Sequence, residues 1–207
     1  MRNVVIVGIS TGVGKTFISS IVVEALEAEY WKPVQAGNLE FTDTDVVKSL
    51  VSNNRSVYHS EGYRLTKPMS PHAAAKIDGV SIELNKLALP NTNTNLVIEI
   101  AGGIMVPLND MQLNIDLIEQ WDTPVILVSQ NYLGSINHTI LSIDALRSRA
   151  INILGIIFNG ERNAATEEFI LSYTGLKCIG KVNTEKEISK EIVKRYANEL
   201  KENLNSL

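Results

Sequence analysis

The sequence predicts one α/β domain over residues 1–207, with a mostly parallel β-sheet flanked by helices on both faces. Short apolar runs alternate with longer segments of helical periodicity, most of the runs are apolar throughout, and the first run leads into a glycine-rich loop. Continuous apolar runs are typical of strands that are covered on both faces. Strand–helix alternation favours right-handed crossovers between parallel strands. A chain of 207 residues suits a single domain.

Six runs are predicted to be strands because they are short, apolar and rich in β-branched residues. In chain order they are residues 4–7, 30–35, 96–100, 125–129, 153–158 and 177–182. Ligands of such sheets bind outside the carboxyl ends of the strands. We therefore look for chemistry where these runs end.

Helices are predicted where apolar residues recur on one face. They cover residues 16–29, 44–51, 136–148, 164–173 and 186–203. The last has a stripe of apolar residues four apart, and we expect it to pack on the edge of the sheet. Residues 53–95 are less regular, and we interpret them as a crossover with one weak helix near residues 81–89.

Composition excludes several classes of protein. A net charge of -4 and the lack of a basic stripe argue against nucleic-acid binding. The single cysteine, Cys178, allows neither an intrachain disulfide nor a cysteine-based metal site, and a buried thiol is expected there. There is no signal-peptide pattern and no apolar run of membrane-spanning length, so we expect a soluble cytoplasmic protein.

The sharpest motif is the loop from Gly8 to Thr16, which ends in Gly-Lys-Thr at the start of a helix. Glycines let backbone N–H groups turn toward a phosphate, and the helix N-terminus adds a positive dipole end. Lys15 would reach the β- and γ-phosphates of a nucleotide, and the Thr16 hydroxyl would bind Mg²⁺. Five residues rather than the usual four separate Gly8 from Gly14. A glycine-rich turn with an incidental lysine is the alternative, but the strand–loop–helix context favours phosphate binding.

Together with this loop, four further segments resemble the dethiobiotin synthase family in order and position. They are residues 32–37, 70–72, 99–103 followed by Pro107-Leu108, and 133–138. The resemblance implies ATP-dependent ring closure of 7,8-diaminopelargonic acid with CO2. A carbamate forms first, ATP phosphorylates it, and the neighbouring amine displaces phosphate. It also implies Mg²⁺ as cofactor and a homodimer with the substrate site at the interface.

The resemblance also implies a role for individual residues. The catalytic residues would be Lys32, Lys15 and Thr11. Nucleotide would bind at Gly12, Val13, Gly14, Lys15, Thr16, Phe17 and Asn159. The metal would be held by Thr16, Asp45 and Glu99. Substrate would contact Thr11, Lys32, Ala36, Gly102, Gly103 and, from the neighbouring subunit, Gly134, Ser135, Ile136 and Asn137.

Some of these roles have a plain structural alternative. Asp45 or Asp43 would suit a helix cap, Ser135 another, and Asn159 a strand-end turn. Glu99 is different, because it ends an apolar strand and a buried carboxylate is costly unless it is paired or bound to metal.

The chain departs from the family pattern at three places. Ala36 stands where a serine is usual, Ile100 stands where a glycine is usual, and residues 181–184 replace a proline-containing nucleotide-binding turn. Purine selectivity therefore stays open.

Two other functions fit a phosphate loop, because the loop alone names no reaction. One is another ATP-dependent amide-forming ligase, which usually carries a glutaminase domain for which this chain has no room. The other is a partitioning or septum-site ATPase switch of the ParA or MinD type. Such switches carry an extra lysine early in the loop, where this chain has Ser10, and often a basic terminal helix, whereas residues 186–203 mix both charges evenly.

Overall fold

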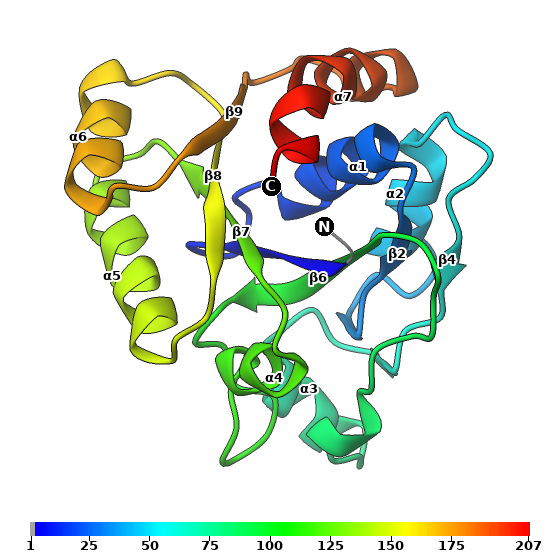
Figure 1. Ribbon diagram of the computed structural model, residues 1–207. Helices are drawn as coiled ribbons and strands as arrows, with labels where there is room; N and C mark the ends of the chain where they lie inside the picture. Colours follow the sequence, from blue (N-terminus) through cyan, green and yellow to red (C-terminus); the bar gives the residue numbers. More distant parts are fainter. Residues whose placement is uncertain (1–2) are drawn as a thin grey trace.

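The computed structural model describes residues 3–207 and is built around a seven-stranded sheet (Figure 1). The strand order is β4-β2-β6-β1-β7-β8-β9, and β3 and β5 form a separate two-stranded sheet. All ladders between these strands are parallel. The strands are β1 (Asn3–Gly8), β2 (Glu29–Trp31), β3 (Val34–Ala36), β4 (Tyr58–His59), β5 (Tyr63–Leu65), β6 (Leu96–Gly103), β7 (Val125–Gln130), β8 (Ile153–Asn159) and β9 (Cys178–Val182). The predicted fold class is confirmed.

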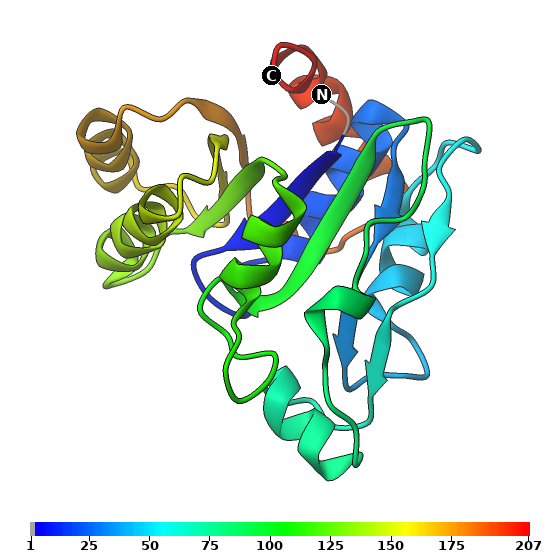
Figure 2. The ribbon, with the colours of Figure 1, turned by 60° about the horizontal axis from the view of Figure 1, so that its bottom comes forward.

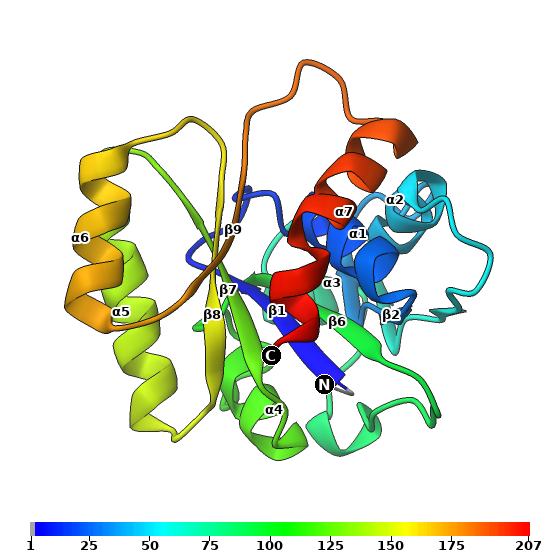
Figure 3. The same ribbon diagram turned by 45° about the horizontal axis from the view of Figure 1, so that its top comes forward.

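Helices cover both faces of the large sheet, as right-handed crossovers require. Figures 1 and 3 show α1 and α7 side by side on one face, and α5 and α6 side by side on the other. The helices are α1 (Lys15–Leu26), α2 (Asp43–Leu50), α3 (Pro71–Ile77), α4 (Asn114–Trp121), α5 (Ser135–Ser148), α6 (Ala164–Thr174), α7 (Lys190–Asn205) and the 3₁₀ turn η1 (Leu84–Lys86).

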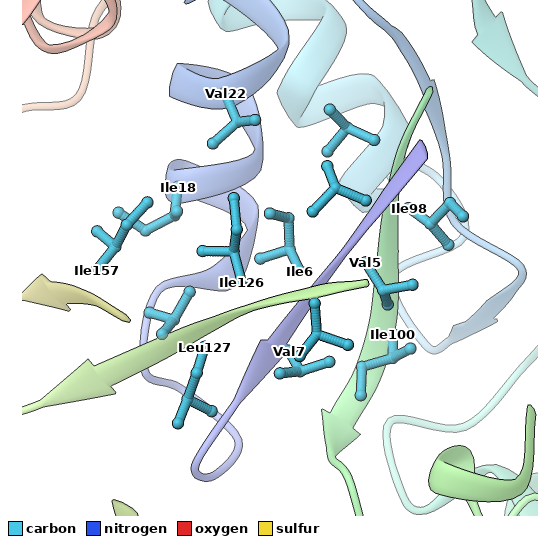
Figure 4. Packing of buried hydrophobic residues seen from close by; sticks show 14 of the residues in the cluster. Val5, Ile6, Val7, Ile18, Val22, Ile98, Ile100, Ile126, Leu127 and Ile157 are labelled. Atoms are coloured by element: carbon cyan, nitrogen blue, oxygen red, sulfur yellow. The ribbon is translucent and has the colours of Figure 1, made fainter. Parts of the chain in front are cut away.

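The core lies between β1 and the helices that cover it. Residues 4–7 of β1 are all buried, which agrees with the continuous apolar run in the sequence. Ile18 and Val22 of α1 pack over Ile6 and Ile126 (Figure 4). This packing fixes the start of α1 against the tip of β1, which is where the glycine-rich loop joins them.

The predicted strand at residues 30–35 is wrong as a single element. Its first part is β2, which pairs with β6, and its second part is β3, which pairs with β5. Lys32 and Pro33 lie between the two. Proline has no N–H for a sheet ladder, so the chain changes partner at this point.

The irregular segment before β6 holds more structure than the sequence predicts. It contains β4, β5 and α3 and runs along the side of the sheet formed by β2 and β4 (Figure 2, cyan to green). The weak helix expected near residues 81–89 is reduced to η1. Helix α4 was also not predicted.

The last helix is shorter at its start than predicted and packs differently. Ser189 caps it, so that it begins at Lys190. It lies along α1 as well as against β9, rather than on the sheet edge alone. Gly180 of β9 makes room for it, because a Cβ there would come within 2.6 Å of Leu200.

Candidate active site

A cavity of about 560 Å³ opens at the carboxyl ends of β1 and β6, beside the link between β2 and β3. This is the edge at which parallel sheets bind ligands. Nine of the predicted site residues line it, namely Thr11, Gly12, Gly14, Lys15, Thr16, Lys32, Ala36, Glu99 and Gly102. They come from three segments that are far apart in the sequence, so the fold assembles one site from separate motifs.

The glycine-rich loop has the backbone conformation of a phosphate cradle. Gly12 and Gly14 have φ of 79° and 86°, in the left-handed region that favours glycine. A Cβ on Gly14 would also come within 2.1 Å of the Asn159 amide nitrogen. Gly14 caps α1 without a side chain, and the first helical bond runs from Ile18 N to Gly14 O. The N–H groups of the first helical turn are therefore available to an anion.

Lys15 lies folded across this loop, and its ammonium donates to the Ser10 carbonyl at 3.1 Å. The side chain is buried in the cavity wall. Burial lowers the pKa of Lys15 to about 8, although Glu99 opposes the shift. A bound triphosphate would supply the negative charge that this buried ammonium lacks.

Glu99 is the centre of the site. Its carboxylate is buried in the middle of β6 and accepts three hydrogen bonds. Thr16 Oγ1 and Lys32 Nζ donate to Oε1 at 2.8 and 2.9 Å, and Tyr30 OH donates to Oε2 at 2.9 Å. Burial alone would raise the pKa of Glu99, but the Lys32 ammonium outweighs it and lowers that pKa. Glu99 is therefore an anion.

Lys32 is held between two carboxylates, from Glu99 and Asp43. Burial opposes its charge, but both anions outweigh the burial and raise the pKa of Lys32. Its side chain is only 6% exposed, so it is not a surface lysine. The ammonium faces the cavity, where a carbamate and a γ-phosphate would meet.

The aspartate that lines the cavity is Asp43, and not Asp45, which the sequence predicted there. The Asp45 carboxylate accepts from the Thr42 backbone and hydroxyl, both at 2.9 Å, and closes a capping box at the start of α2. Asp43 instead lines the cavity and pairs with Lys32. Gln35, buried in the cavity wall, accepts from the Asp43 N–H at 3.3 Å and fixes the start of α2.

These residues fit a magnesium ion. Thr16, Asp43 and Glu99 offer the hard oxygen ligands that Mg²⁺ prefers, and the oxygens of Thr16 and Glu99 lie 2.8 Å apart. The Lys32 ammonium already bridges the two carboxylates, so the pair is arranged around positive charge.

The glycines after Glu99 do two different things. Gly102 has φ of 73°, and a Cβ there would meet Val106 at 2.9 Å and the Thr11 hydroxyl at 3.3 Å. Gly102 thus lets the cavity reach the phosphate loop. Gly103 does not line the cavity, and its carbonyl accepts from Asn114 at 2.9 Å. Ile100 lies in the core near Val7 (Figure 4), so this departure leaves the cavity unchanged.

The remaining residues that were predicted to bind nucleotide pack behind the glycine-rich loop and do not line the cavity. Asn159, at the end of β8, donates to the Val13 carbonyl at 2.9 Å. Phe17 is buried and packs edge-on against Tyr196 of α7, with ring centroids 6.2 Å apart. The side chains of Val13 and Phe17 therefore belong to the core, and only their backbone would face a nucleotide.

Residues 134–137 comprise the N-cap and the first residues of α5, and they do not line the cavity of their own chain. Gly134 precedes the helix with φ of 101°. The buried Ser135 hydroxyl finds no hydrogen-bond partner within residues 3–207.

The chain resembles known proteins both in its sequence and in its fold. Residues 2–192 match the family described as an AAA domain. The ATP-dependent dethiobiotin synthetases of Cytophaga hutchinsonii and Christiangramia forsetii are 50% and 49% identical to the chain, and the matches cover 98% of each protein.

Solved structures resemble the chain in fold alone. A ParA family ATPase from Chlorobium tepidum has a TM-score of 0.59 at 13% identity, over 95% of this chain and 97% of that one. MinD of Pyrococcus horikoshii, complexed with Mg-ADP, has a TM-score of 0.56 at 14% identity, over 96% and 95%. Within the described residues, no helix is long and apolar enough to cross a membrane.

Proposed function

The chain belongs to the dethiobiotin synthetase family, and we propose on that premise that it is an ATP-dependent ligase of biotin synthesis. Its substrates are 7,8-diaminopelargonic acid, CO2 and ATP, and its product is dethiobiotin. The observation that carries the proposal is the convergence of Thr16, Lys32 and Glu99 in one cavity at the phosphate loop.

The first steps need positive charge rather than a covalent nucleophile. One amine of the diamine attacks CO2 and loses a proton, which gives a carbamate. We place that carbamate between Lys32 and the Thr11 hydroxyl, both of which line the cavity. Ala36 has no hydroxyl to add to it. The carbamate oxygen then attacks the γ-phosphorus of ATP, and ADP leaves. Lys15 and the amides of the loop offset the charge that develops on the phosphoryl oxygens.

Ring closure follows in the same place. The second amine attacks the carbamate carbon, phosphate leaves and a proton is released, which completes the cyclic urea. The reaction is accelerated because both reacting groups are held together, as in other intramolecular reactions. Mg²⁺, held by Thr16, Asp43 and Glu99, would neutralise charge on the β- and γ-phosphates.

The proposal extends to assembly and location. The first turn of α5, residues 134–137, would hold the substrate carboxylate of a neighbouring subunit, so the working form would be a homodimer with the substrate at its interface. Asn159 would read the edge of the base. The enzyme would act in the cytoplasm, on small molecules, without nucleic acid or membrane.

A switch ATPase is the less favoured function. The likeness to ParA and MinD proteins rests on fold at 13–14% identity, whereas synthetases match over the full length at about half identity.

The test is substrate dependence. ADP release by the purified chain should require both bicarbonate and 7,8-diaminopelargonic acid, and DNA, lipid or glutamine should not alter it. Lys32→Ala should remove turnover while circular dichroism stays that of the parent chain. ADP release that ignores the diamine would refute the proposal, and so would near-normal turnover by Lys32→Ala.

A further inference from the structure

The two oxygens of Glu99 have different surroundings. Oε1 receives Thr16 and Lys32, both of which line the cavity. Oε2 receives Tyr30 OH at 2.9 Å, and Tyr30 does not line the cavity. Tyr30 is 0% exposed on β2, the strand that pairs with β6. Oε1 therefore lies on the side of the cavity, and Oε2 lies on the side of the protein interior.

We propose that Tyr30 is a positioning residue whose hydroxyl holds Glu99 with Oε1 turned toward the metal and phosphates. This inference rests on the proposed function, because it gives Glu99 the role of a metal ligand. Tyr30 would touch neither substrate nor cofactor and would act through Glu99 alone.

The physical reason is the freedom of a carboxylate about its last torsion. That torsion is broad, so packing alone selects an orientation only weakly. Without a donor at Oε2, a buried anionic oxygen would lack a partner, which is costly. Glu99 would then rotate to share the donors at Oε1, and Thr16 and Lys32 would be drawn out of place.

The hydroxyl of Tyr30 has no other use in the described chain. Its one hydrogen bond within residues 3–207 goes to Glu99. A phenylalanine would fill the same volume in the core of the sheet. Packing of the core therefore does not require the hydroxyl oxygen of Tyr30.

The experiment is a Mg²⁺ titration of nucleotide binding, measured calorimetrically with a non-hydrolysable ATP analogue. Tyr30→Phe should need at least about tenfold more Mg²⁺ for half-maximal binding, as loss of a hydrogen bond to a charged group predicts. Binding in EDTA should change less than about twofold, because the loop and Lys15 are untouched. Tyr58→Phe is the matched control, since Tyr58 pairs with Tyr30 on the neighbouring strand and is half-buried. It should behave as the parent chain.

A double-mutant cycle shows whether the effect passes through Glu99. In a Glu99→Gln chain, adding Tyr30→Phe should no longer shift the Mg²⁺ requirement. A Tyr30→Phe titration that superposes on that of the parent would overturn the inference, and so would an unfolded variant, which would make the hydroxyl structural. If the parent chain itself binds nucleotide independently of Mg²⁺, it is the proposed metal site that fails.

Discussion

At the scale of single residues, the buried ammonium of Lys15 predicts how nucleotide affinity depends on pH. The free chain holds the pKa of Lys15 at about 8, chiefly through burial, and a bound triphosphate would raise it. Binding then takes up a proton above pH 8. Affinity for ATP should be full below about pH 8 and should fall by up to about tenfold per unit above it.

Calorimetry in buffers between about pH 7 and pH 9.5 would measure this slope. Lys15→Gln, which should bind weakly, should show no slope. Stability without nucleotide should respond with the opposite sign. Because the folded pKa lies below the ordinary 10.5, this group favours the folded chain as pH rises between those two values. An ATP affinity that is constant up to pH 9.5 would contradict the assignment.

The two acidic residues at the start of α2 should differ sharply on substitution. Asp43→Asn removes a partner of Lys32 and a candidate metal ligand, so turnover should fall by about 100-fold or more. Asp45→Asn disturbs a capping box, so it should cost about 1 kcal/mol of folding free energy and leave turnover within about twofold. Steady-state kinetics and urea unfolding of both variants would check this. Equal losses of activity would show that the geometry of α2 matters as a whole.

This pair also shows where sequence reasoning reached its limit. Two Thr-Asp pairs in succession gave no reason from composition to choose between Asp43 and Asp45. The spacing from Thr42 to Asp45 matches a capping box, and it would have identified Thr42 as the N-cap and Asp45 as its partner in the box. The contact of Tyr30 with Glu99 left no such signal, because it joins neighbouring strands 69 residues apart.

At the scale of elements, the well-predicted parts are those whose pattern is local. The strand before the phosphate loop and helix α1 follow from apolar periodicity and glycine chemistry. The strand at residues 30–35 was predicted as one element because its apolar run is unbroken apart from Lys32-Pro33. Its division depends on β5 and β6, distant segments that offer separate partners. Tertiary pairing decided this case over local pattern.

One buried carboxylate, Glu167 of α6, ties the loops after β7 and β8 to strand β9. Arg162 and Lys181 pair with it at 2.9 and 3.0 Å, and Asn131 donates at 3.0 Å. Burial opposes the charge, but these donors, with Arg162 first, lower the pKa of Glu167 to about 2. The stability that it contributes is therefore present above pH 4.5 and is lost as pH falls from there toward 2.

Glu167→Gln should cost about 2–4 kcal/mol in urea unfolding at pH 7, because two cations lose their partner. It should also weaken the acid dependence of stability between about pH 4.5 and pH 3. Glu168→Gln removes the same charge from the exposed neighbouring position and should change little. Equal effects of the two substitutions would indicate that the loss of stability comes from the change in net charge rather than from the contacts of Glu167.

At the scale of the whole molecule, the arrangement predicts complementation between two inactive variants. Lys15→Ala disables the nucleotide half of a site. If α5 holds the substrate carboxylate as proposed, Asn137→Asp would place a second carboxylate against it, yet suit the first turn of α5. If each site draws on two subunits, mixed dimers regain one intact site.

Refolding equal amounts of the two variants together should then restore about a quarter of parental activity, since half of the dimers are mixed and half of their sites are intact. Each variant refolded alone is the control, and sedimentation should report a dimer. A mixture as inactive as its parts, although dimeric, would mean that each chain completes its own site.

In the whole molecule, the fold and the site carry different information about function. Its architecture is shared with ParA and MinD proteins at low identity, so architecture alone left the function open. The apolar runs in the sequence predict the strands of the sheet. We attribute the reaction to a few polar side chains in the cavity, where Lys32, Asp43 and Glu99 meet.

The change of partner between β2 and β3 makes chain length critical at the two residues between them. Side chains of a strand alternate between faces, so one extra residue there would reverse every side chain of β3. Gln35 would leave the cavity and Val34 would turn toward it. We therefore expect a library of single-codon insertions and deletions to tolerate almost nothing between Trp31 and Val34. The adjacent turn at residues 37–41, outside any strand or helix, should accept them far more often.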